Sequence, residues 1–434
     1  MIDGLHGAGN QPRTTSSGVT PPAGSSERPR LLFLCQSLPF PPDGGAHLRS
    51  YNILRLLSRT FDVTSLMFYK RATRPTEEDV RRGVDGMREL GPAYAFRIPQ
   101  DVGRTRWVWD HLRSVITGRA YTRYLYEDNG FTERLNGLLE REPPDIVHVD
   151  SIDLSGYLPR VSHLPVVLTH HNVESRLLAR RGAAGRGLSR LYLTHQARLT
   201  EAEERRFCSR VDLNVVVSDV DRSVLESVVP CTSIIVPNGV DTKVFRPRPA
   251  ESPSGIVFVG GASWLPNLDA MTYFCEEILP LVRDRCGDVE VTWVGVASDA
   301  DRERFRDCPI ELTGYVDVVQ PFVQRAACYV VPLRIGGGTR LKIVDAWAMG
   351  APIVSTSIGC EGLAAADEEN MLIRDDPVTF ADAICRLLAD SELRARLSRG
   401  GRRTAETMYD WDVIGREMIG HYSALVGRPS ASAR

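Results

Sequence analysis

"RIGGGTRLKIVDAWAMGAPIVST", residues 334–356, contains a loop, a helix and a strand in one run. Three consecutive glycines predict an irregular loop, and the apolar residues after them have the three- and four-residue spacing of a helix. Gly350 is a helix stop, Pro352 prevents the helix from resuming, and a β-branched run follows. The preceding apolar segment "CYVVPL", residues 328–333, is typical of a buried strand. The glycines are therefore expected at the carboxyl end of that strand.

The same alternation of strand and helix continues on both sides of this unit. Nearly all-apolar strands that alternate with amphipathic helices indicate a parallel sheet with helices on both faces. The further strands that we predict are residues 30–38, 61–69, 145–150, 165–172, 211–218, 233–239, 255–261, 289–296, 310–316 and 371–373. Helices are predicted after several of them, including one over residues 268–284 and one over 377–389.

A proline-rich segment, residues 240–254, divides the chain into two halves. A chain of 434 residues exceeds the usual size of a single core, so two domains are expected. The fold class that we predict is α/β, with two doubly wound, Rossmann-like parallel-sheet domains facing each other across a cleft. The predicted units are a disordered tail (1–28), an N-terminal domain (29–240), a linker (241–254), a C-terminal domain (255–405), a helix that packs back towards the N-terminal domain (406–427) and a second disordered tail (428–434).

The composition is that of a soluble globular protein, with 43% hydrophobic and 25% charged residues. The net charge of −2 gives no general attraction to nucleic acid or membrane, and no nucleic-acid partner is expected. The nine cysteines form no close pair, which argues against a zinc site or a disulfide framework and favours reduced cytosolic thiols. No apolar run approaches a membrane span, and residues 1–28 lack the apolar core of a signal peptide. We therefore expect a cytoplasmic protein.

The start of the helix after the glycine loop suits a phosphorylated ligand. Thr339 is the predicted N-cap, and the helix N-terminus carries partial positive charge. Arg340 offers a forked donor to phosphate and Lys342 a point charge. Asp345 lies on the helical face of Lys342 and would repel phosphate unless it accepts hydrogen bonds from sugar hydroxyls of the same ligand. Phosphate with ribose indicates a nucleotide, whereas the alternative is a tight loop beside which Arg340, Lys342 and Asp345 are surface charges in a local salt bridge.

Other phosphate-binding classes fit this loop less well. No G-K-[ST] follows the glycines, so the loop is not a P-loop. No G-x-G-x-x-G follows a strand, which disfavours a nicotinamide-dependent dehydrogenase.

The segment from Gly314 to Leu363 resembles the donor-binding half of a retaining, GT-B fold glycosyltransferase of the family 4 type, in the subgroup with a G-G-G-T-R-L-K block. The resemblance extends in order from about Arg30 to Val426. The other segments that carry it are "SLPFPPDGGAHLRSYNILRLL", "PDIVHVD", "VVLTHHNVES", "VVVSDVD", "IIVPNGVDTKVFRP" and "FVGGASWLPNLDAMTYF".

The resemblance implies a nucleotide-sugar-dependent, hexosyltransferase-type enzyme. Its N-terminal domain would receive the acceptor, and its C-terminal domain would bind the nucleotide sugar. The partners implied are the nucleotide-sugar donor and a small-molecule, glycan or lipid-linked acceptor with a hydroxyl group. Two other functions stay open, a nucleotide-sugar epimerase of GT-B fold and a catalytically silent module that binds nucleotide or sugar.

The resemblance also assigns site residues. His171 matches the family histidine near the reacting sugar, and His170 is the less suitable match. Arg340 and Lys342 would hold the diphosphate and Asp345 the ribose, so the catalytic residues are His171, Arg340 and Lys342. The other donor-binding positions are Gly44, Gly45, Gly314, Tyr315, Val316, Gly337, Gly338 and Thr339, and Glu361, in the loop after residues 352–356, is a candidate contact to the donor sugar or a helix cap.

The chain departs from the family pattern at three positions. Of two glutamates found eight residues apart in many members, the first is Gly337 here and the second is Asp345. Many members have Arg and Lys after the first strand of the C-terminal domain, where this chain has Gly261 and about Asn267. The positive charge must therefore come from Arg340 and Lys342, while Asn267 either lines the site with Trp264 or caps a helix.

No metal or other cofactor is expected. A metal-dependent transferase presents clustered carboxylates such as Asp-x-Asp near the diphosphate. The nearest pair here, Asp150 and Asp153, is three residues apart and belongs to the N-terminal half.

Two further features have alternative interpretations. His47 and Arg49 follow the Gly44–Gly45 loop and would either contact phosphate or acceptor or, for Arg49, lie on a solvated face. Residues 104–126 mix basic and aromatic side chains, either as a surface for a lipid-linked acceptor or peripheral membrane contact, or as a packed helical face. The aromatic residues concerned are Trp107, Trp109, Tyr121, Tyr124 and Tyr126.

Overall fold

The structure is a computed structural model of the 434-residue chain and describes residues 28–42, 44–248, 252–336 and 340–428. Most of the two predicted tails lies outside the described residues. Gly337, Gly338 and Thr339, which the sequence assigns to the donor site, also lie outside them.

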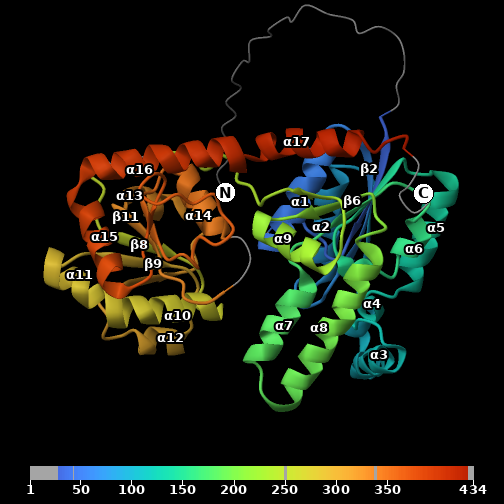
Figure 1. Ribbon diagram of the computed structural model, residues 1–434, viewed down its shortest axis with the longest axis horizontal. Coiled ribbons are helices and arrows are strands. Elements are labelled where there is room, and N and C mark those ends of the chain that lie inside the picture. The colour runs from blue at the N-terminus through green and yellow to red at the C-terminus, as the bar shows by residue number, and fades with distance from the viewer. Residues whose placement is uncertain (1–27, 43, 249–251, 337–339, 429–434) are drawn as a thin grey trace, which may run out of the picture.

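Two parallel sheets confirm the predicted α/β class (Figure 1). The first sheet has seven strands in the order β3-β2-β1-β4-β5-β6-β7, and all its pairs are parallel. Its strands are β1 (Arg30–Cys35), β2 (Asp62–Tyr69), β3 (Ala93–Arg97), β4 (Ile146–Val149), β5 (Val166–Thr169), β6 (Leu213–Val216) and β7 (Ser233–Ile235). The sequence analysis did not predict β3, because this edge strand is only half-buried and lacks the apolar run of the central strands.

The second sheet has six strands in the order β10-β9-β8-β11-β12-β13. Its strands are β8 (Ile256–Val259), β9 (Val291–Val294), β10 (Glu311–Gly314), β11 (Cys328–Val331), β12 (Ile353–Ser355) and β13 (Leu372–Ile373). Each sheet reverses its strand order next to its first strand, at β1/β4 and at β8/β11. Ligands of doubly wound sheets bind at the carboxyl ends of the strands beside such a reversal.

Helices cover both sheets. Those of the first half are α1 (Gly45–Leu57), α2 (Glu77–Arg88), α3 (Arg104–Thr117), α4 (Thr122–Leu125), α5 (Asn129–Arg141), α6 (Leu158–Val161), α7 (Glu174–Ala184), α8 (Gly187–Phe207) and α9 (Asp219–Val228). Those of the second half are α10 (Leu265–Tyr273), α11 (Leu279–Cys286), α12 (Asp299–Arg304), α13 (Gln320–Arg325), α14 (Leu341–Ala348), α15 (Pro377–Ala389), α16 (Ser391–Thr404) and α17 (Trp411–Ser423). Short 3₁₀ or π segments are η1 (Pro99–Val102), η2 (Ile152–Leu154), η3 (Phe274–Ile278) and η4 (Ala405–Tyr409).

The last helix, α17, belongs to the core of the N-terminal domain. Its buried side chains Trp411, Ile414, Met418 and Tyr422 join the apolar cluster that covers one face of the first sheet. The two helices approach closely, since a Cβ on Gly415 of α17 would lie 2.6 Å from Leu56 Cδ2 of α1. The chain therefore returns to its first domain after completing its second.

The two passages of the chain between the domains run side by side. The backbone N–H of Val240 donates to the carbonyl of Tyr409 at 2.8 Å, and the N–H of Trp411 donates to the carbonyl of Val240 at 3.2 Å. The Asp410 carboxylate also accepts a hydrogen bond from the Thr242 hydroxyl. Helices α16 and α17 run along one side of both domains (Figure 1).

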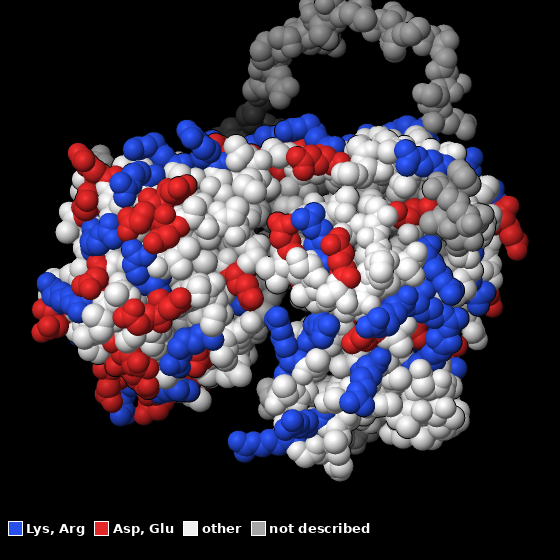
Figure 2. All heavy atoms as spheres, in the orientation of Figure 1, with Lys and Arg blue, Asp and Glu red and all other residues white. Residues whose placement is uncertain are grey.

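Charge is unevenly distributed over the surface. Figure 2 shows both signs of charge interspersed over the C-terminal domain and mainly basic side chains around α7 and α8. Among the described residues, no helix has the length and apolar character needed to cross a membrane.

Candidate active site

The carboxyl edges of the two sheets meet between the domains. Gly45, the first residue of α1, faces Leu341, the first residue of α14, since a Cβ at Gly45 would lie 3.6 Å from Leu341 Cδ1. A pocket at these carboxyl edges is lined by α7, the β6–α9 loop and two residues of the C-terminal domain, Glu361 and Gly362. Side chains from both halves of the chain thus surround one cleft.

On the N-terminal side, His171 pairs with Asp150. Asp150 follows β4 and His171 follows the neighbouring strand β5, so both lie at the carboxyl edge of the sheet. The His171 Nε2 lies 3.3 Å from Asp150 Oδ2. The Asp150 side chain is completely buried, whereas that of His171 is 11% exposed. The dyad therefore presents its histidine, and not its carboxylate, to solvent.

The Asp150 carboxylate collects several further donors. Ser50 Oγ donates to it at 2.5 Å and Cys35 Sγ at 3.2 Å. Burial by itself would raise the pKa of Asp150, but the charge of His171 and the hydrogen bonds from His148 and His171 outweigh it and hold the pKa well below the usual range. Asp150 is therefore ionised at neutral pH although it is buried.

The network extends to the C-terminal helix. Tyr422 of α17 lies with its hydroxyl 2.7 Å from His148 Nδ1, and His148 Nε2 lies 3.4 Å from Asp150 Oδ1. Burial lowers the pKa of His148, which favours a neutral ring. A neutral ring can accept from Tyr422 at Nδ1 and donate to Asp150 at Nε2. Helix α17 is thus connected through two side chains to the carboxylate that holds His171.

His170 has a different environment from His171. Its Nε2 lies 3.1 Å from Asn214 Oδ1, and burial lowers its pKa to about 4. It is therefore a neutral core residue, which matches the sequence-based preference for His171 as the residue in the cleft.

Arg49 is buried and not on a solvated face, so that interpretation of it is wrong. It is 2% exposed, and its Nη1 donates to Asn238 Oδ1 at 3.1 Å. Burial lowers its pKa to about 10, although the charge of Asp150 opposes the shift. The sequence interpretation failed because Arg49 is on the face of α1 that packs on the sheet. His47 lies in the first turn of α1 and is half-buried.

On the C-terminal side, Arg340 occupies the N-cap position of α14. The helix starts at Leu341, so Arg340 precedes the first turn in which the sequence placed it. Its guanidinium lies 5.6 Å from the ring centroid of Trp264, and the side chain is almost completely buried. The absence of a side chain at Gly336 leaves room for the Arg340 guanidinium, since a Cβ at Gly336 would lie 2.6 Å from Arg340 Nη2, and the φ of Gly336 is +138°.

Lys342 is held in place by Asn267. Its Nζ donates to Asn267 Oδ1 at 2.7 Å and lies 4.5 Å from the ring centroid of Phe258. Burial, with a contribution from the Arg340 charge, lowers the pKa of Lys342 to about 7. Asn267 is in the first turn of α10, whose N-cap position is Trp264, so its interpretation as a helix cap is wrong.

Asp345 is desolvated without a counter-charge. Burial raises its pKa to about 7. Among the described residues its carboxylate has no salt bridge, and the local Lys342–Asp345 pair that was the alternative interpretation does not form. Lys342 and Asp345 are therefore both desolvated ionisable groups in the ligand-free protein.

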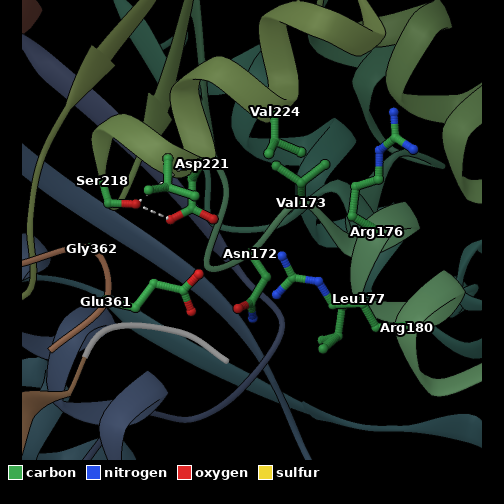
Figure 3. Close-up of a pocket in the computed structure, with 11 residues that line it drawn as sticks. Asn172, Val173, Arg176, Leu177, Arg180, Ser218, Asp221, Val224, Glu361 and Gly362 are labelled. Atoms are coloured by element: carbon green, nitrogen blue, oxygen red, sulfur yellow. Dashed lines mark hydrogen bonds between the residues drawn. The ribbon is translucent and has the colours of Figure 1, made fainter. Parts of the chain in front are cut away.

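Glu361 lies close to Arg340. Burial lowers the pKa of Arg340, and the negative charge of Glu361 opposes this shift. The side chains of Arg340, after β11, and Glu361, after β12, therefore interact electrostatically. In Figure 3 its carboxylate points across the pocket towards Asn172 of the N-terminal domain, with Arg180 beyond. Asp221, which accepts from Ser218 Oγ at 2.6 Å, closes one side of this pocket. Glu361 therefore faces the N-terminal domain from the C-terminal side of the cleft.

The remaining predicted residues are distributed around the same edges. Gly44 precedes α1, and no atom lies within 4 Å of a Cβ built on it. Gly314 ends β10 with φ +77°, Tyr315 after it is 76% exposed, and Val316 packs on the C-terminal core. Strand β10 is three strand positions from β11, roughly 14 Å at ~4.8 Å per strand. The Gly314 loop and the loop that leads to Arg340 therefore follow strands that are three positions apart in the sheet.

Sequence reasoning missed one functional candidate, Asp150. Asp150 was considered only as half of a metal-binding pair with Asp153. The signal for its pairing with His171 was available, because both residues end strands that could be neighbours in a parallel sheet. For Asn267, which was expected either to line the site or to cap a helix, the contact with Lys342 could not be found in this way, because it crosses 75 residues of sequence. Within the described residues, no group of three His, Cys, Asp or Glu side chains is placed to hold a metal ion.

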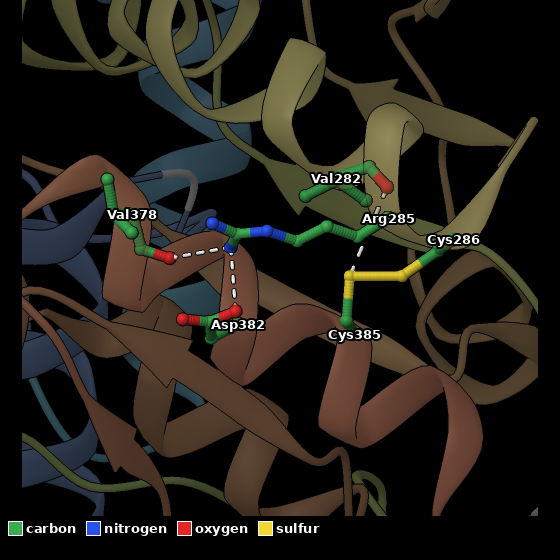
Figure 4. The surroundings of a disulfide bond; sticks show 6 residues. All are labelled: Val282, Arg285, Cys286, Val378, Asp382 and Cys385. Atoms are coloured by element: carbon green, nitrogen blue, oxygen red, sulfur yellow. Dashed lines mark hydrogen bonds and ion pairs between the residues drawn. A yellow bond between two sulfur atoms is a disulfide. The ribbon is translucent and has the colours of Figure 1, made fainter.

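A disulfide lies outside the site and corrects the expectation that the cysteines are unpaired. Cys286 at the end of α11 is bonded to Cys385 in α15 (Figure 4). Beside it, Arg285 donates to the carbonyl of Val378 at 3.0 Å and to Asp382 Oδ1 at 2.7 Å. This bond could not be predicted from the sequence, because the two cysteines are 99 residues apart and only the packing of α11 on α15 brings them together.

Comparisons with known protein families agree with this arrangement. Residues 44–244 match the family described as "Glycosyltransferase Family 4", and residues 253–390 match "Glycosyl transferases group 1". Two Rossmann-like domains with a ligand-facing cleft define the GT-B class of fold. The chain carries a glycosyltransferase family 4 domain followed by a glycosyl transferases group 1 domain.

Curated relatives are similar over part of their length. The chain is 29% identical to the D-inositol 3-phosphate glycosyltransferase of Acidothermus cellulolyticus over 228 residues, which are 46% of this chain and 50% of that protein. It is 27% identical to the MMP alpha-(1->4)-mannosyltransferase of Mycolicibacterium hassiacum over 213 residues, 45% of this chain and 49% of that one. A Klebsiella pneumoniae protein described as an "Uncharacterized 44.6 kDa protein in cps region" is 26% identical over 138 residues, 30% of this chain and 36% of that one. The chain thus spans about half the length, or less, of these relatives.

Solved structures share the fold over almost the whole chain. Sucrose-phosphate synthase from Thermosynechococcus elongatus has a TM-score of 0.64 at 16% identity and covers 91% of this chain and 99% of its own. Anabaena HepE, in complex with UDP-glucose, has a TM-score of 0.61 at 13% identity and covers 91% of this chain and 100% of its own. At these identities the likeness establishes the GT-B fold.

Proposed function

We propose that this protein is a glycosyltransferase that moves a sugar from a nucleotide-sugar donor to a hydroxyl group of an acceptor, with retention of anomeric configuration. The observation that carries the proposal is the pair of desolvated groups Lys342 and Asp345, one turn apart beside Arg340. Burial shifts both pKa values towards 7 and so disfavours both charges. A ligand with phosphate next to sugar hydroxyls would supply a partner to each of them.

On the donor side, we assign the diphosphate to Arg340 and Lys342 and the ribose to Asp345. The base would lie towards the Gly314 loop at the far side of the sheet, and the sugar towards Glu361 and the cleft. Negative charge grows on the leaving diphosphate during transfer, and cations that are fixed beforehand stabilise it without reorganisation. Family 4 similarity and the UDP-glucose bound to HepE support this assignment.

On the acceptor side, we assign His171 and Asp150 to the reacting sugar. Glycosyl transfer develops oxocarbenium character on the donor sugar. His171 Nε2 faces the ionised Asp150, so the other ring nitrogen can hydrogen-bond a sugar hydroxyl, while the negative charge of Asp150 stabilises positive charge on the sugar in a cleft that excludes water. The leaving phosphate would take the proton of the attacking hydroxyl on the same face of the sugar, which retains the configuration.

The first experiment is to find the donor. Thermal unfolding is measured with UDP, GDP, dTDP and ADP and with their sugars, since a ligand at 100 times its Kd stabilises by ~2.7 kcal/mol. The stabilising nucleotide sugar is then incubated with a panel of hydroxyl acceptors, and the products are analysed by mass spectrometry. Glycosylated acceptor is the expected product. Interconversion of the sugar without acceptor would instead indicate an epimerase, and binding without any product a silent module.

We further propose that the activity needs no divalent metal, because Arg340 and Lys342 supply the positive charge that an ion would otherwise bring to the diphosphate. Turnover should be unchanged by excess EDTA and by added magnesium. Activity that EDTA abolishes and magnesium restores would contradict this proposal.

A further inference from the structure

Helix α3 exposes its apolar side and buries its polar side. The exposed side chains include Trp109, which is 54% exposed, and Ile116, which is 70% exposed. At 100° per residue, five of its exposed apolar residues fall within about a third of the helix circumference. These five residues are Val108, Trp109, Leu112, Val115 and Ile116.

The opposite side of α3 is polar and packs on the N-terminal domain. Asp110 and Ser114 are both completely buried. Asp110 accepts from Arg106 Nε at 2.8 Å, and Ser114 Oγ accepts from Gln196 Nε2 of α8 at 2.9 Å. A surface helix of a globular protein normally turns its apolar stripe inward. Because the polar contacts fix α3 in the opposite orientation, its apolar stripe has no partner within the described residues.

The neighbouring helix α8 extends this apolar surface. The rings of His111 on α3 and Tyr192 on α8 lie 5.6 Å apart, so the two helices are side by side. Near the start of α8, Leu188 is 84% exposed and Leu191 is 68% exposed. We call the exposed apolar side chains of both helices the α3–α8 surface; they are Trp107, Val108, Trp109, Leu112, Val115, Ile116, Leu188 and Leu191.

Arginines concentrate beside the α3–α8 surface. Residues 176–198 of the α7–α8 hairpin contain six arginines and no acidic residue, in a chain whose net charge is −2. None of the six forms a salt bridge or side-chain hydrogen bond with a residue that the structure describes. Figure 2 shows an uncharged lobe at the position of α3 with basic side chains around it. Four of the six are Arg181, Arg186, Arg190 and Arg198; the other two, Arg176 and Arg180, line the pocket that also contains Glu361.

We propose that the α3–α8 surface docks on an anionic lipid bilayer, with α3 lying in the interface and the hairpin arginines contacting lipid headgroups. A helix with tryptophan and aliphatic side chains on one face and arginines beside it fits the boundary between acyl chains and headgroups. Unpaired arginines near a surface are attracted to anionic lipids. A second copy of the chain would bring the same six positive charges against these, which disfavours self-association. This inference goes beyond the proposed transfer reaction and does not depend on it.

The test is cosedimentation of the full chain with vesicles of phosphatidylcholine alone or with 30% phosphatidylglycerol. We expect at least tenfold tighter binding to the anionic vesicles, weakened at 500 mM salt. The variant W109E/I116E should bind at least tenfold more weakly. The variant R181E/R186E/R190E keeps the apolar face intact and should lose roughly fivefold or more for each arginine at low salt.

Matched controls are V296E/V318E, which changes two exposed valines of the C-terminal domain, and R399E/R403E/R416E, which reverses three exposed arginines of α16 and α17. Both controls should bind as the wild type does. Circular dichroism melting establishes that each variant is folded, and a W107F/W109F variant should lose the vesicle-induced blue shift of tryptophan fluorescence.

Three results would overturn the proposal. One is equal binding of the wild type to neutral and anionic vesicles, or no binding to either. Another is wild-type binding by folded W109E/I116E. The last is a dimer in analytical ultracentrifugation without lipid that W109E/I116E dissociates, since the surface would then join two copies of this chain.

Discussion

The sheet edges of the two domains that face the cleft differ in how they stabilise buried charge. At the N-terminal edge, Asp150 lies among four side-chain partners and its charge is stabilised. At the C-terminal edge, within the part of the chain that the structure describes, Lys342 has one amide oxygen as its hydrogen-bond acceptor and Asp345 has no counter-charge. Burial shifts both of their pKa values towards 7.

The difference indicates separate tasks. A carboxylate with its donors already in place keeps one orientation and needs no ligand, which suits a group that acts on the reacting sugar. Groups that burial has destabilised gain most when a charged ligand arrives, which suits the binding of a nucleotide that is released after each turnover. Substitutions at the N-terminal edge should therefore change turnover. Substitutions at the C-terminal edge should change the affinity for the nucleotide and the stability of the protein.

The largest expected effect is on turnover at the N-terminal edge. We expect His171→Ala and Asp150→Asn each to lower kcat by roughly 100- to 1,000-fold, the range of a positioned acid–base or electrostatic group, with little change in donor Kd. The double variant should lose little more than either single one, because the two side chains act as one unit. Steady-state kinetics and calorimetric titration measure both quantities.

His163→Ala provides the control for this prediction, since His163 is an exposed residue before β5, at the other end of the sheet. Wild-type kcat in His171→Ala would make His171 a structural residue. Fully multiplicative losses would show that Asp150 acts on something other than His171.

At the C-terminal edge, Arg340→Ala and Lys342→Met should each lower kcat/KM by roughly 10- to 100-fold. Each would remove one of the charge-assisted hydrogen bonds that we propose to the diphosphate, worth ~1.5–3 kcal/mol. Asp345→Asn should mainly weaken nucleotide binding, because an amide accepts fewer hydrogen bonds from ribose hydroxyls. Arg399→Ala, at an exposed position of α16, is the matched control. Full activity in the Arg340→Ala, Lys342→Met double variant would contradict the binding of the diphosphate at this edge.

The same lysine should destabilise the ligand-free protein. The pKa of Lys342 is about 7 in the folded protein, below the ~10.4 of an unfolded lysine, so the unfolded chain binds more protons between these values. The destabilisation is complete below pH 7 and disappears as the pH rises from 7 towards ~10. Lys342→Met should therefore raise Tm at pH 6, by roughly 2–4 °C per kcal/mol regained, and less at pH 9.

Calorimetry of both proteins at the two pH values measures this difference. Asp345→Asn should show the opposite trend, with the larger gain at high pH, because burial raises the pKa of Asp345. A Lys342→Met variant that is less stable than the wild type at pH 6 would show that the lysine is not strained in the free protein.

The smallest effect is expected at the connection between α17 and the dyad. Tyr422→Phe keeps the packing but removes the donor to His148, so kcat should fall about threefold to tenfold, in line with a hydrogen bond worth ~1 kcal/mol. Donor affinity should stay unchanged. Tyr94→Phe on the edge strand β3 is the control. Equal kinetics in the two variants would show that the contact of α17 with His148 does not influence turnover.

How much of the fold and of the candidate site the sequence can predict depends on how far apart in the sequence the contacting residues are. The helix over Pro377–Ala389 is found with its predicted bounds, because periodicity and capping are local. The order of the family segments also places the glycine loop, His171 and Glu361 at strand ends. The burial of Arg49 depends on which face of α1 packs on the sheet. The pairing of Asp150 with His171 depends on which strands are neighbours, and the sequence shows only that both residues end strands. The Asn267–Lys342 contact and the Cys286–Cys385 bond join even more distant positions.

The place of α17 has a consequence for the order in which the molecule is made. The first domain to leave the ribosome lacks Trp411, Ile414, Met418 and Tyr422, which complete its core and reach His148. The second domain, whose sheet and main helices end before residue 405, is finished earlier in synthesis although it starts later. Domains generally fold as units during translation, beginning with the N-terminal one. In this chain the N-terminal unit has to wait for α17, so the network from Tyr422 through His148 and Asp150 to His171 is completed only after that helix has been synthesised.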